Sequence, residues 1–421
     1  MIRILFAYGV RCRHVLALAL LGSFTLGERP CAAAGPSAAP ESRDALRHLI
    51  QNARERAPEV KRSLAAFSAS KSAFVGGRLA PFGNPYLEIT AQGANKDVVK
   101  DVALSGSLWL PIEVSGQRSS RQREAEEFVA LHSTGVQVAR ASAASRAVKA
   151  YGRAVVAVER ASVLAQLLVN ARAESRMLAE RMASGDAVQH DASLAATEAA
   201  RDEMLIAENE AELVNARGEL EELVGEAGAP LSPVVPPLLS AAGAGEEKLP
   251  ALPQSQALLA ESRYYDASAE RARREGGSLL SVGVIAGRGD YGETRLGGGL
   301  AYAFPAFRSN QLETARNEAE SRRARTERQL FGEVASRRLL VLRNEQQQLL
   351  RALAVLSEVA LPAARTAVRA VQETYEAGKA ELLSVLLTRR ELSALSLRRL
   401  ALFDRSWVLV GDYVEITGDL P

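Results

Sequence analysis

Cysteine is nearly absent from this chain, which has only Cys12 and Cys31 among 421 residues. Both lie in an N-terminal segment built like a secretory signal peptide: arginines, an apolar run from Val15 to Leu26, and small residues at Ala32-Ala33-Ala34. We expect cleavage after Ala34, so that residues 1–34 form the signal peptide. The chain that remains has no thiol, which excludes disulfides, a cysteine nucleophile and thiolate metal ligands.

Two kinds of membrane anchor are also missing at this end. The apolar run is too short for a membrane-spanning helix, which needs ~20 residues. Glu28-Arg29-Pro30 precede Cys31 where a lipoprotein cleavage site has small apolar residues. We therefore do not expect a lipid anchor on Cys31.

The chain lacks an excess of either charge. Its formal charge is +2, and the signal peptide removes four arginines and one glutamate, which leaves about −1. No basic excess remains to bind nucleic acid. No uninterrupted apolar stretch of about 18 residues follows the signal peptide, so we expect any membrane crossing to use strands.

What the chain does contain is an internal repeat. Leu110-Pro111-Ile112 recurs in outline as Phe304-Pro305-Ala306, and Arg123-Glu124-Ala125-Glu126 recurs as Asn317-Glu318-Ala319-Glu320, both 194 residues later. Each copy has the same order of helix, two strands, a very long helix, a Gly turn and a returning helix. We assign residues 35–225 to the first repeat, 226–253 to a Pro/Ala/Gly linker, extended or loosely structured, and 254–421 to the second repeat.

Four segments of about ten residues alternate between apolar and other side chains, as membrane strands do. The apolar sets are Leu87, Ile89, Ala91; Val102, Leu104, Gly106, Leu108, Leu110, Ile112; Leu280, Val282, Val284, Ala286; and Leu296, Gly298, Leu300, Tyr302, Phe304. Four strands cannot close a barrel, and open edges are not tolerated in lipid. Three chains would supply twelve strands, so the pattern predicts a homotrimer with a shared barrel.

The helical segments are long. No proline occurs from Ser115 to Ala183, and ~67 residues at ~1.5 Å each make a rod of about 100 Å. The second copy predicts a helix from Asn310 to Glu376. The returning helices, Val188–Val224 and Ala380–Val410, are about half as long. Helices at Arg43–Lys71 and Gln254–Arg274 would supply the missing half if stacked end to end with them.

Heptad spacing predicts an apolar seam along each long helix. In the first copy the seam is Val148, Tyr151, Val155, Val158, Ser162, Ala165 and Val169. In the second it is Leu342, Gln346, Leu349, Leu353, Leu356, Ala360, Ala363, Ala367 and Ala370. Its many alanines allow close helix approach. Such helices need neighbours on both sides, as in a closed ring.

Taken together, these features resemble the TolC-like outer-membrane efflux proteins across about Arg43 to Gly418. Asn84-Pro85-Tyr86-Leu87 is similar to the opening of the family's first strand. Leu361-Pro362-Ala363 and Tyr375-x-x-Gly378 are similar to the approach to its second helical turn. Ile112-Glu113, Gly116-Gln117-Arg118 and Arg121 resemble the heavy-metal (CzcC-like) branch, although the chain has few histidines and methionines.

The resemblance implies α plus membrane β architecture: a trimer with a 12-stranded β-barrel in outer-membrane lipid and a periplasmic α-helical tunnel. It implies that the two helical turns far from the membrane contact a periplasmic adaptor and form the gate. The residues placed there are Gly185, Asp186, His190, Asp191, Gly378, Lys379, Ser384 and Leu387, with Pro111 and Pro305 at the membrane strand ends. Ser384 and Leu387 stand where other members carry acidic residues, so we expect a small or apolar constriction.

Several motifs have simpler explanations. Gly287-x-Gly289-x-x-Gly292 has the spacing of a dinucleotide fingerprint, but a strand is predicted next where the fingerprint needs a helix; we interpret it as a hairpin loop. His48, His132 and His190 form no ligand pair and are expected on the solvated surface. His190 beside Asp191 stays open as an adaptor or pH-sensitive contact. Gly185 and Gly378 are either ordinary helix caps or functional turns.

Within the second long helix, Pro362 should kink or loosen it and assist opening of the nearby turn. The sequence thus favours an exit duct without enzymatic activity or cofactor, linked through an adaptor to an inner-membrane pump. A pump of the RND type is the first candidate. Two alternatives stay open: an outer-membrane component of type I protein secretion, and a soluble periplasmic coiled-coil scaffold.

Overall fold

The computed structural model describes residues 40–93, 102–185, 188–225, 236, 238–239, 246–288, 293–305, 307 and 309–421. The predicted signal peptide with Cys12 and Cys31, most of the predicted linker, and Asp186 lie outside these ranges. Residues 38–421 form a single unit that contains every described element.

The described elements follow one order twice. The first series is α1 (Pro40–Arg56), α2 (Pro58–Gly77), β1 (Tyr86–Gly93), β2 (Val102–Glu113), α3 (Gln117–Ala183) and α4 (Gln189–Val224). The second is a 3₁₀ turn η2 (Glu246–Ala251), α5 (Pro253–Glu275), β3 (Leu279–Arg288), β4 (Thr294–Ala303), α6 (Gln311–Val355), a π turn η3 (Leu356–Ala360), α7 (Leu361–Glu376) and α8 (Leu382–Thr417). The expected 67-residue helix is confirmed in α3. The bounds of the two repeats and the linker remain predictions.

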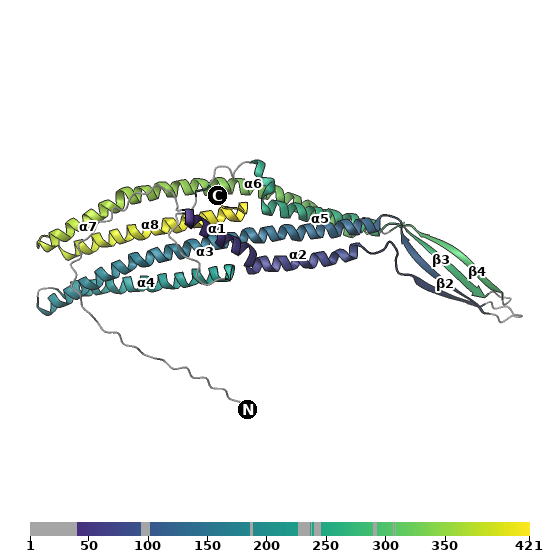
Figure 1. The fold of residues 1–421 in the computed structure, drawn as a ribbon, viewed down its shortest axis with the longest axis horizontal. Helices are drawn as coiled ribbons and strands as arrows, with labels where there is room; N and C mark the ends of the chain where they lie inside the picture. The colour runs from purple at the N-terminus through teal and green to yellow at the C-terminus, as the bar shows by residue number, and fades with distance from the viewer. Residues whose placement is uncertain are drawn as a thin grey trace, which may run out of the picture. The chain divides into compact units, whose positions relative to one another are not determined.

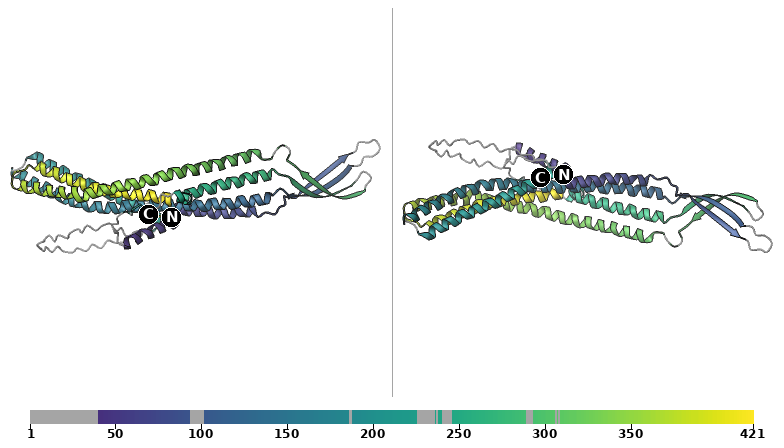
Figure 2. Two further views of the ribbon diagram at one scale, coloured as in Figure 1. Left: turned by 90° about the horizontal axis from the view of Figure 1, so that it is seen from above. Right: turned by 90° about the horizontal axis from the view of Figure 1, so that it is seen from below.

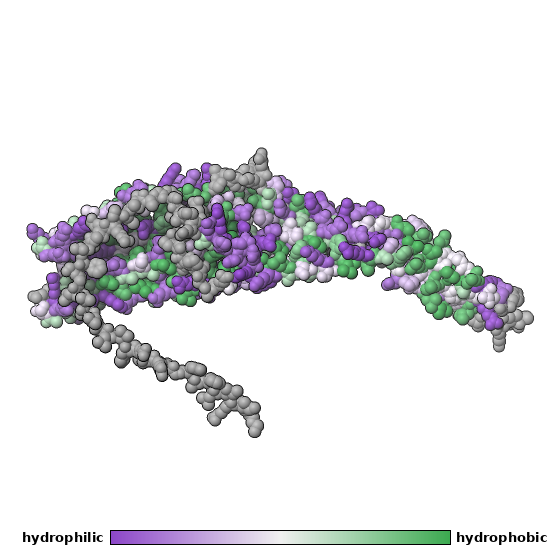
Figure 3. All heavy atoms as spheres, in the orientation of Figure 1, coloured by the Kyte–Doolittle hydropathy of each residue, from purple (hydrophilic) through white to green (hydrophobic). Residues whose placement is uncertain are grey.

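The strands form one antiparallel sheet in the order β1-β2-β3-β4. Its register places Leu87 opposite Leu108, Leu108 opposite Val284, and Val282 opposite Leu300. The predicted apolar sets therefore share one face, and large side chains on it are exposed, Leu296 at 80 %. Figure 3 shows hydrophobic residues gathered over this sheet. β1 and β4 each have one edge with no described partner strand.

The helices continue the order of the strands. Near the sheet, α2 packs on α3, α3 on α5, and α5 on α6. Farther away, α4 and α8 take the places of α2 and α5 beside α3. Figure 1 shows α4 and α2 following one another along α3, as the helix lengths predicted. In both views of Figure 2 the sheet lies at one end and the α3–α4 and α7–α8 turns at the other.

The main core lies where α3 packs against α8. Trp407 of α8 is 1 % exposed and meets the Tyr151 ring edge-on at 5.6 Å between centroids. Gly152 makes this approach possible, since a Cβ there would lie 2.3 Å from the Trp407 Cβ. Small residues at such crossings let helices approach closely and gain dispersion contacts.

The predicted first seam is only partly right. Val148, Tyr151 and Val155 are buried, whereas Val158, Ser162, Ala165 and Val169 are exposed and Ala157, Leu164 and Leu178 are buried instead. The buried stripe has moved by one residue because α3 changes neighbours along its length. No local pattern in α3 encodes where α2 and α5 give way to α4 and α8.

The prediction of the second seam is right before the π turn η3 and wrong after it. Leu342, Gln346, Leu353 and Leu356 are buried as predicted, but Ala363, Ala367 and Ala370 are exposed. Leu361, Ala364 and Val368 turn inward in their place. A π turn adds one residue to a helical turn, so the seam shifts by one.

Pro362 accounts for the position of that turn. Proline has no N–H and its ring clashes with the carbonyl four residues earlier. Leu361, the residue before it, instead donates its N–H to the Leu356 carbonyl, closing the wider turn. The single helix expected over Asn310–Glu376 is thus divided into α6, η3 and α7. A second proline, Pro58, similarly divides the helix expected at Arg43–Lys71 into α1 and α2.

Gln346, the polar member of the seam, has a specific partner. Its Oε1 accepts the Leu239 backbone N–H at 2.7 Å, and Leu239 is buried. Part of the segment predicted as a loose linker is therefore held against the core, and η2 forms a short helix just before α5.

Helix α3 is also long enough and apolar enough over 18 residues to cross a membrane by length and composition. The stretch is not an uninterrupted apolar run, because Glu159 and Arg160 lie within it. Its contacts with α4 and α8 identify this stretch as a packing helix of the bundle.

Candidate functional site: the paired helical tips

The first tip is the turn between α3 and α4. Gly185 follows the helix with a φ of 84°, a left-handed conformation that favours glycine. Its N–H donates to the Met182 carbonyl at 3.1 Å, as at a helix C-terminal cap. Helix α4 then starts after Val188, and the Asp191 carboxylate lies in its first turn, where negative charge favours the helix dipole.

The second tip, between α7 and α8, has the same geometry. Gly378 has a φ of 68°. Its N–H donates to the Tyr375 carbonyl, and the Lys379 N–H to the Thr374 carbonyl, both at 2.9 Å. These two bonds form a complete Schellman cap. The cap interpretation is therefore confirmed for both glycines, and both sit in tips at the same end of the unit. A functional role of the two turns stays a prediction.

A small apolar cluster joins the two tips. It contains buried Leu178, Ala195 and Leu382 with half-buried Ala192, Tyr375 and Leu386, from α3, α4, α7 and α8. At its edge Arg181 donates from Nη1 to the Tyr375 hydroxyl at 3.3 Å. The two hairpins thus rest on each other near their turns.

Near the tips, an ionic contact crosses between the hairpins. The Arg389 guanidinium of α8 contacts the Glu174 carboxylate of α3, and its Nη2 donates to Gln372 Oε1 of α7 at 3.2 Å. The two charged side chains are only 25 % and 13 % exposed. Burial lowers the pKa of Arg389 below its ordinary value, yet arginine stays protonated at neutral pH. This contact holds the α7–α8 hairpin against α3.

The structure places the predicted tip residues on the surface. His190, Lys379 and Ser384 are exposed, and Leu387 is 55 % exposed. Asp186 lies outside the described residues. Glu174, Arg389 and Gln372 carry no sequence signal of this role, because no local pattern marks the contact between Glu174 and Arg389, which are 215 positions apart. The Arg181–Tyr375 contact was not predicted either, because a repeat offset relates equivalent positions and does not place them in contact.

The two prolines assigned to the strand ends differ in place. Pro305 follows β4, but Pro111 lies within β2, opposite Ser281. Its carbonyl accepts the Gly83 N–H at 2.8 Å on the side away from β3. The missing N–H of Pro111 therefore costs no bond of the β2–β3 ladder.

The CzcC-like residues build the joint between sheet and helices. Arg121 donates to both oxygens of Glu113, at 2.7 and 2.9 Å, and this bond raises the pKa of Arg121. Gly116 has a φ of 81°, and Gln117 donates to the Ser278 carbonyl at 3.2 Å. These contacts fix the angle at which β2 enters α3 and tie it to β3.

The structure gives little support to the other candidate binding sites. Gly287 and Arg288 end β3, and strand β4 follows, so the helix that a dinucleotide fingerprint needs is not there. His132 is half-buried, against expectation, because its ring packs edge-on to Phe128 at 4.5 Å; His48 and His190 are exposed. Within the described ranges, no group of three or more His, Cys, Asp or Glu side chains could hold a metal ion.

No family model matches the chain. The cobalt-zinc-cadmium resistance protein CzcC of Cupriavidus metallidurans is 25 % identical over 343 residues, which cover 77 % of this chain and 78 % of that protein. Among solved structures, a membrane protein from Pseudomonas aeruginosa has a TM-score of 0.73 at 19 % identity, covering 88 % of this chain and 89 % of that one. The outer-membrane channel OprN has a TM-score of 0.71 at 18 % identity, covering 89 % and 90 %.

Proposed function

Because the chain belongs to the fold family of the TolC-like outer-membrane efflux channels, we propose that it is the exit duct of a tripartite efflux system. It carries solutes from an inner-membrane pump through an adaptor to the exterior, and a pump of the RND type is the first candidate. The observation that carries this proposal is the sheet: one face is apolar and exposed, and β1 and β4 each have an edge without a partner strand among the described residues. Such a sheet is stable in lipid only when other copies complete it.

We propose a homotrimer, and the edges of the sheet support it. Copies arranged in a ring would pair β4 with the next β1, and α6 with the next α2, because strands and helices share one order. The edge helices carry the exposed apolar side chains that this needs: Leu64 and Val75 on α2, with Leu79 just after it, and Leu312, Leu330 and Val334 on α6. Three copies give twelve strands.

The described residues contain no cysteine, so cross-linking can test the ring. Thr90→Cys in β1 and Gly297→Cys in β4 are combined in one chain and treated in membranes with a flexible bifunctional maleimide. We expect covalent dimers and trimers and nothing larger, and monomers from each single variant. Only monomers, or an open series of larger products, would contradict a closed trimer.

Membrane insertion has a separate test. The channel should stay in the outer membrane after alkaline and high-salt washing and need detergent for release. Release by either wash would favour the periplasmic scaffold. Purified trimers should conduct ions in planar bilayers.

The cargo proposal rests on the relative alone. CzcC is named for cobalt, zinc and cadmium resistance, and we propose divalent metal ions as the first cargo to test. A deletion strain should lose tolerance to these ions and regain it from a plasmid copy. Unchanged tolerance, with channel conductance intact, would exclude metal cargo and leave the duct proposal standing.

We place the gate and the adaptor contact at the tips. Exposed Ser384 and Leu387 carry no negative charge at the two positions that we assign to the constriction, so trivalent cations added at the helical end should not block conductance. Ser384→Asp should introduce such block. A photo-cross-linking residue at Lys379 should capture the adaptor, whereas one at exposed Arg322 of α6, near the sheet, should not. Block of the wild type, or equal capture at both positions, would refute this placement.

A further inference from the structure

One row of residues crosses all four strands on the face opposite the apolar one. Tyr86 of β1 is opposite Trp109 of β2, Trp109 opposite Gly283 of β3, and Gly283 opposite Gly299 of β4. In a closed barrel with its apolar face toward lipid, this row lies on the wall of the lumen. The row therefore places two aromatic rings beside two glycines.

The Trp109 indole lies flat over those glycines. A Cβ on Gly283 would come 2.5 Å from Trp109 Cε3, and one on Gly299 would come 2.7 Å from Cη2. The indole N–H donates to Ser107 Oγ at 2.9 Å. With one ring face against the sheet and the hydrogen-bond donor satisfied, the other ring face is directed away from the wall. Tyr86 beside it is 47 % exposed.

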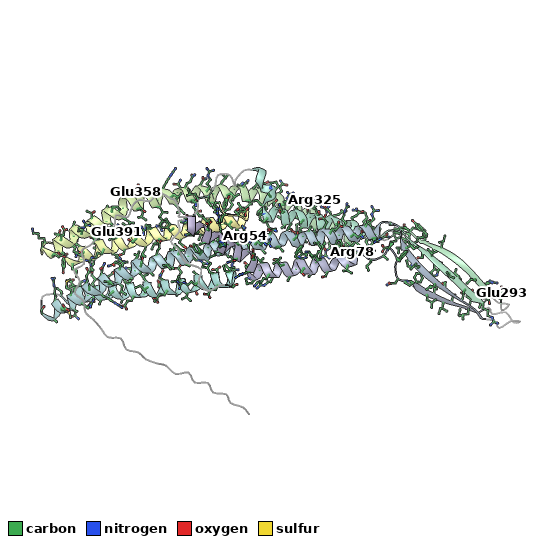
Figure 4. All side chains as sticks on the ribbon, in the orientation of Figure 1. Arg54, Arg78, Glu293, Arg325, Glu358 and Glu391 are labelled. Atoms are coloured by element: carbon green, nitrogen blue, oxygen red, sulfur yellow. The ribbon has the colours of Figure 1, made fainter. Side chains whose placement is uncertain are left out.

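A negative charge adjoins the two rings on the same face. Glu88 lies opposite Ser107 in the register, one cross-strand pair from Trp109. The other charged side chains of this face are neutralised: Glu113 by Arg121, and Arg295 by Glu293. Glu88 has no ion-pair partner among the described residues. Figure 4 shows Glu293 near the end of the sheet farthest from the helices.

We propose that Trp109, Tyr86 and Glu88 form a contact site in the barrel lumen for aromatic organic cations in transit. This inference rests on the proposed channel function, because only a closed barrel makes this face luminal. The ring faces attract cations and stack on aromatic groups, and Glu88 adds charge complementarity. Three chains would place six aromatic rings and three carboxylates around the lumen.

The test measures block of single-channel current by ions added on the sheet side. The probes are benzyltrimethylammonium, tetramethylammonium and benzenesulfonate, which separate aromatic character from charge. We expect the aromatic cation to block at the lowest concentration. Trp109→Leu keeps an apolar side chain over the glycines and should raise its half-blocking concentration about fivefold. Glu88→Gln should weaken block by both cations and lower the cation preference in a salt gradient.

Tyr302→Leu is the matched control, because Tyr302 is an exposed aromatic on the opposite face of the same sheet. It should leave block and selectivity unchanged. If Trp109→Leu does not assemble, Gly299→Ala displaces the indole and should alter the same half-blocking concentration. Equal effects of the Trp109 and Tyr302 variants, or equal block by the aromatic anion, would overturn the proposed contact site. Measurable conductance of the same trimers would still support the channel proposal. A wild-type trimer without conductance overturns both proposals.

Discussion

Arg389 offers the sharpest test of the gate. We choose Arg389→Met, which keeps the length of the side chain and removes its charge. The variant loses the contact with Gln372 and leaves the Glu174 carboxylate, 13 % exposed, without its partner. Exposed pairs contribute about 0.2–1 kcal/mol, and breaking a fully buried pair costs about 3–5 kcal/mol. For this half-buried pair we expect about 2 kcal/mol, between these limits.

That loss acts on the position of the hairpins. The contact exists only while the α7–α8 hairpin lies against α3, and we propose that this arrangement is the closed one. Removal of the contact then destabilises the closed arrangement and not one in which the hairpins separate. A difference of about 2 kcal/mol changes the ratio of the two arrangements roughly 30-fold per protomer. Purified trimers in planar bilayers should therefore spend much more time in the conducting state.

Arg172→Met is the control. Arg172 pairs with Glu203 at 2.8 Å, but this pair lies within the α3–α4 hairpin and does not cross to α7–α8. It should leave the open fraction unchanged. Adding Glu174→Gln to Arg389→Met removes the unpaired charge, and the double-mutant cycle isolates the pair. Equal open fractions for the Arg389 and Arg172 variants would refute the reasoning.

Three further predictions concern the helical part. Gly152→Ala should lower the melting midpoint, because overpacking against Trp407 costs ~1–3 kcal/mol and outweighs the ~1 kcal/mol gained in helix propensity. Gly135 lies on the same helix with open space around it, so Gly135→Ala should raise the melting midpoint. Burial raises the pKa of Asp404 above its ordinary 3.8, so the folded chain keeps that proton to higher pH than the unfolded chain does. The stability of the fold therefore falls as pH rises from the ordinary pKa through the raised one. Asp404→Asn should raise the melting midpoint at pH 7 and change it little at pH 4. Pro362→Ala restores an N–H at the π turn and should lower open fraction and efflux, whereas unchanged conductance and efflux would dissociate Pro362 from opening.

The predicted elements are confirmed where a local sequence pattern or local backbone chemistry determines the structure. Strand alternation identified one face of the sheet because side chains of a strand point to opposite faces by geometry alone. The glycines at 185 and 378 marked both tips because a left-handed turn favours glycine. The duplication, visible as a shared offset of 194 residues, gave the order of elements without any contact information.

Tertiary structure decided what depends on partners distant in the chain. It set the phase of both seams, since α3 changes neighbours along its length and Pro362 inserts a π turn whose extra residue shifts every later position. It also paired Arg389 with Glu174 and laid Trp109 over Gly283 and Gly299. Sequence periodicity determines which face of an element is apolar, but only the folded chain determines which neighbour meets that face, because the meeting depends on the packing of several elements at once.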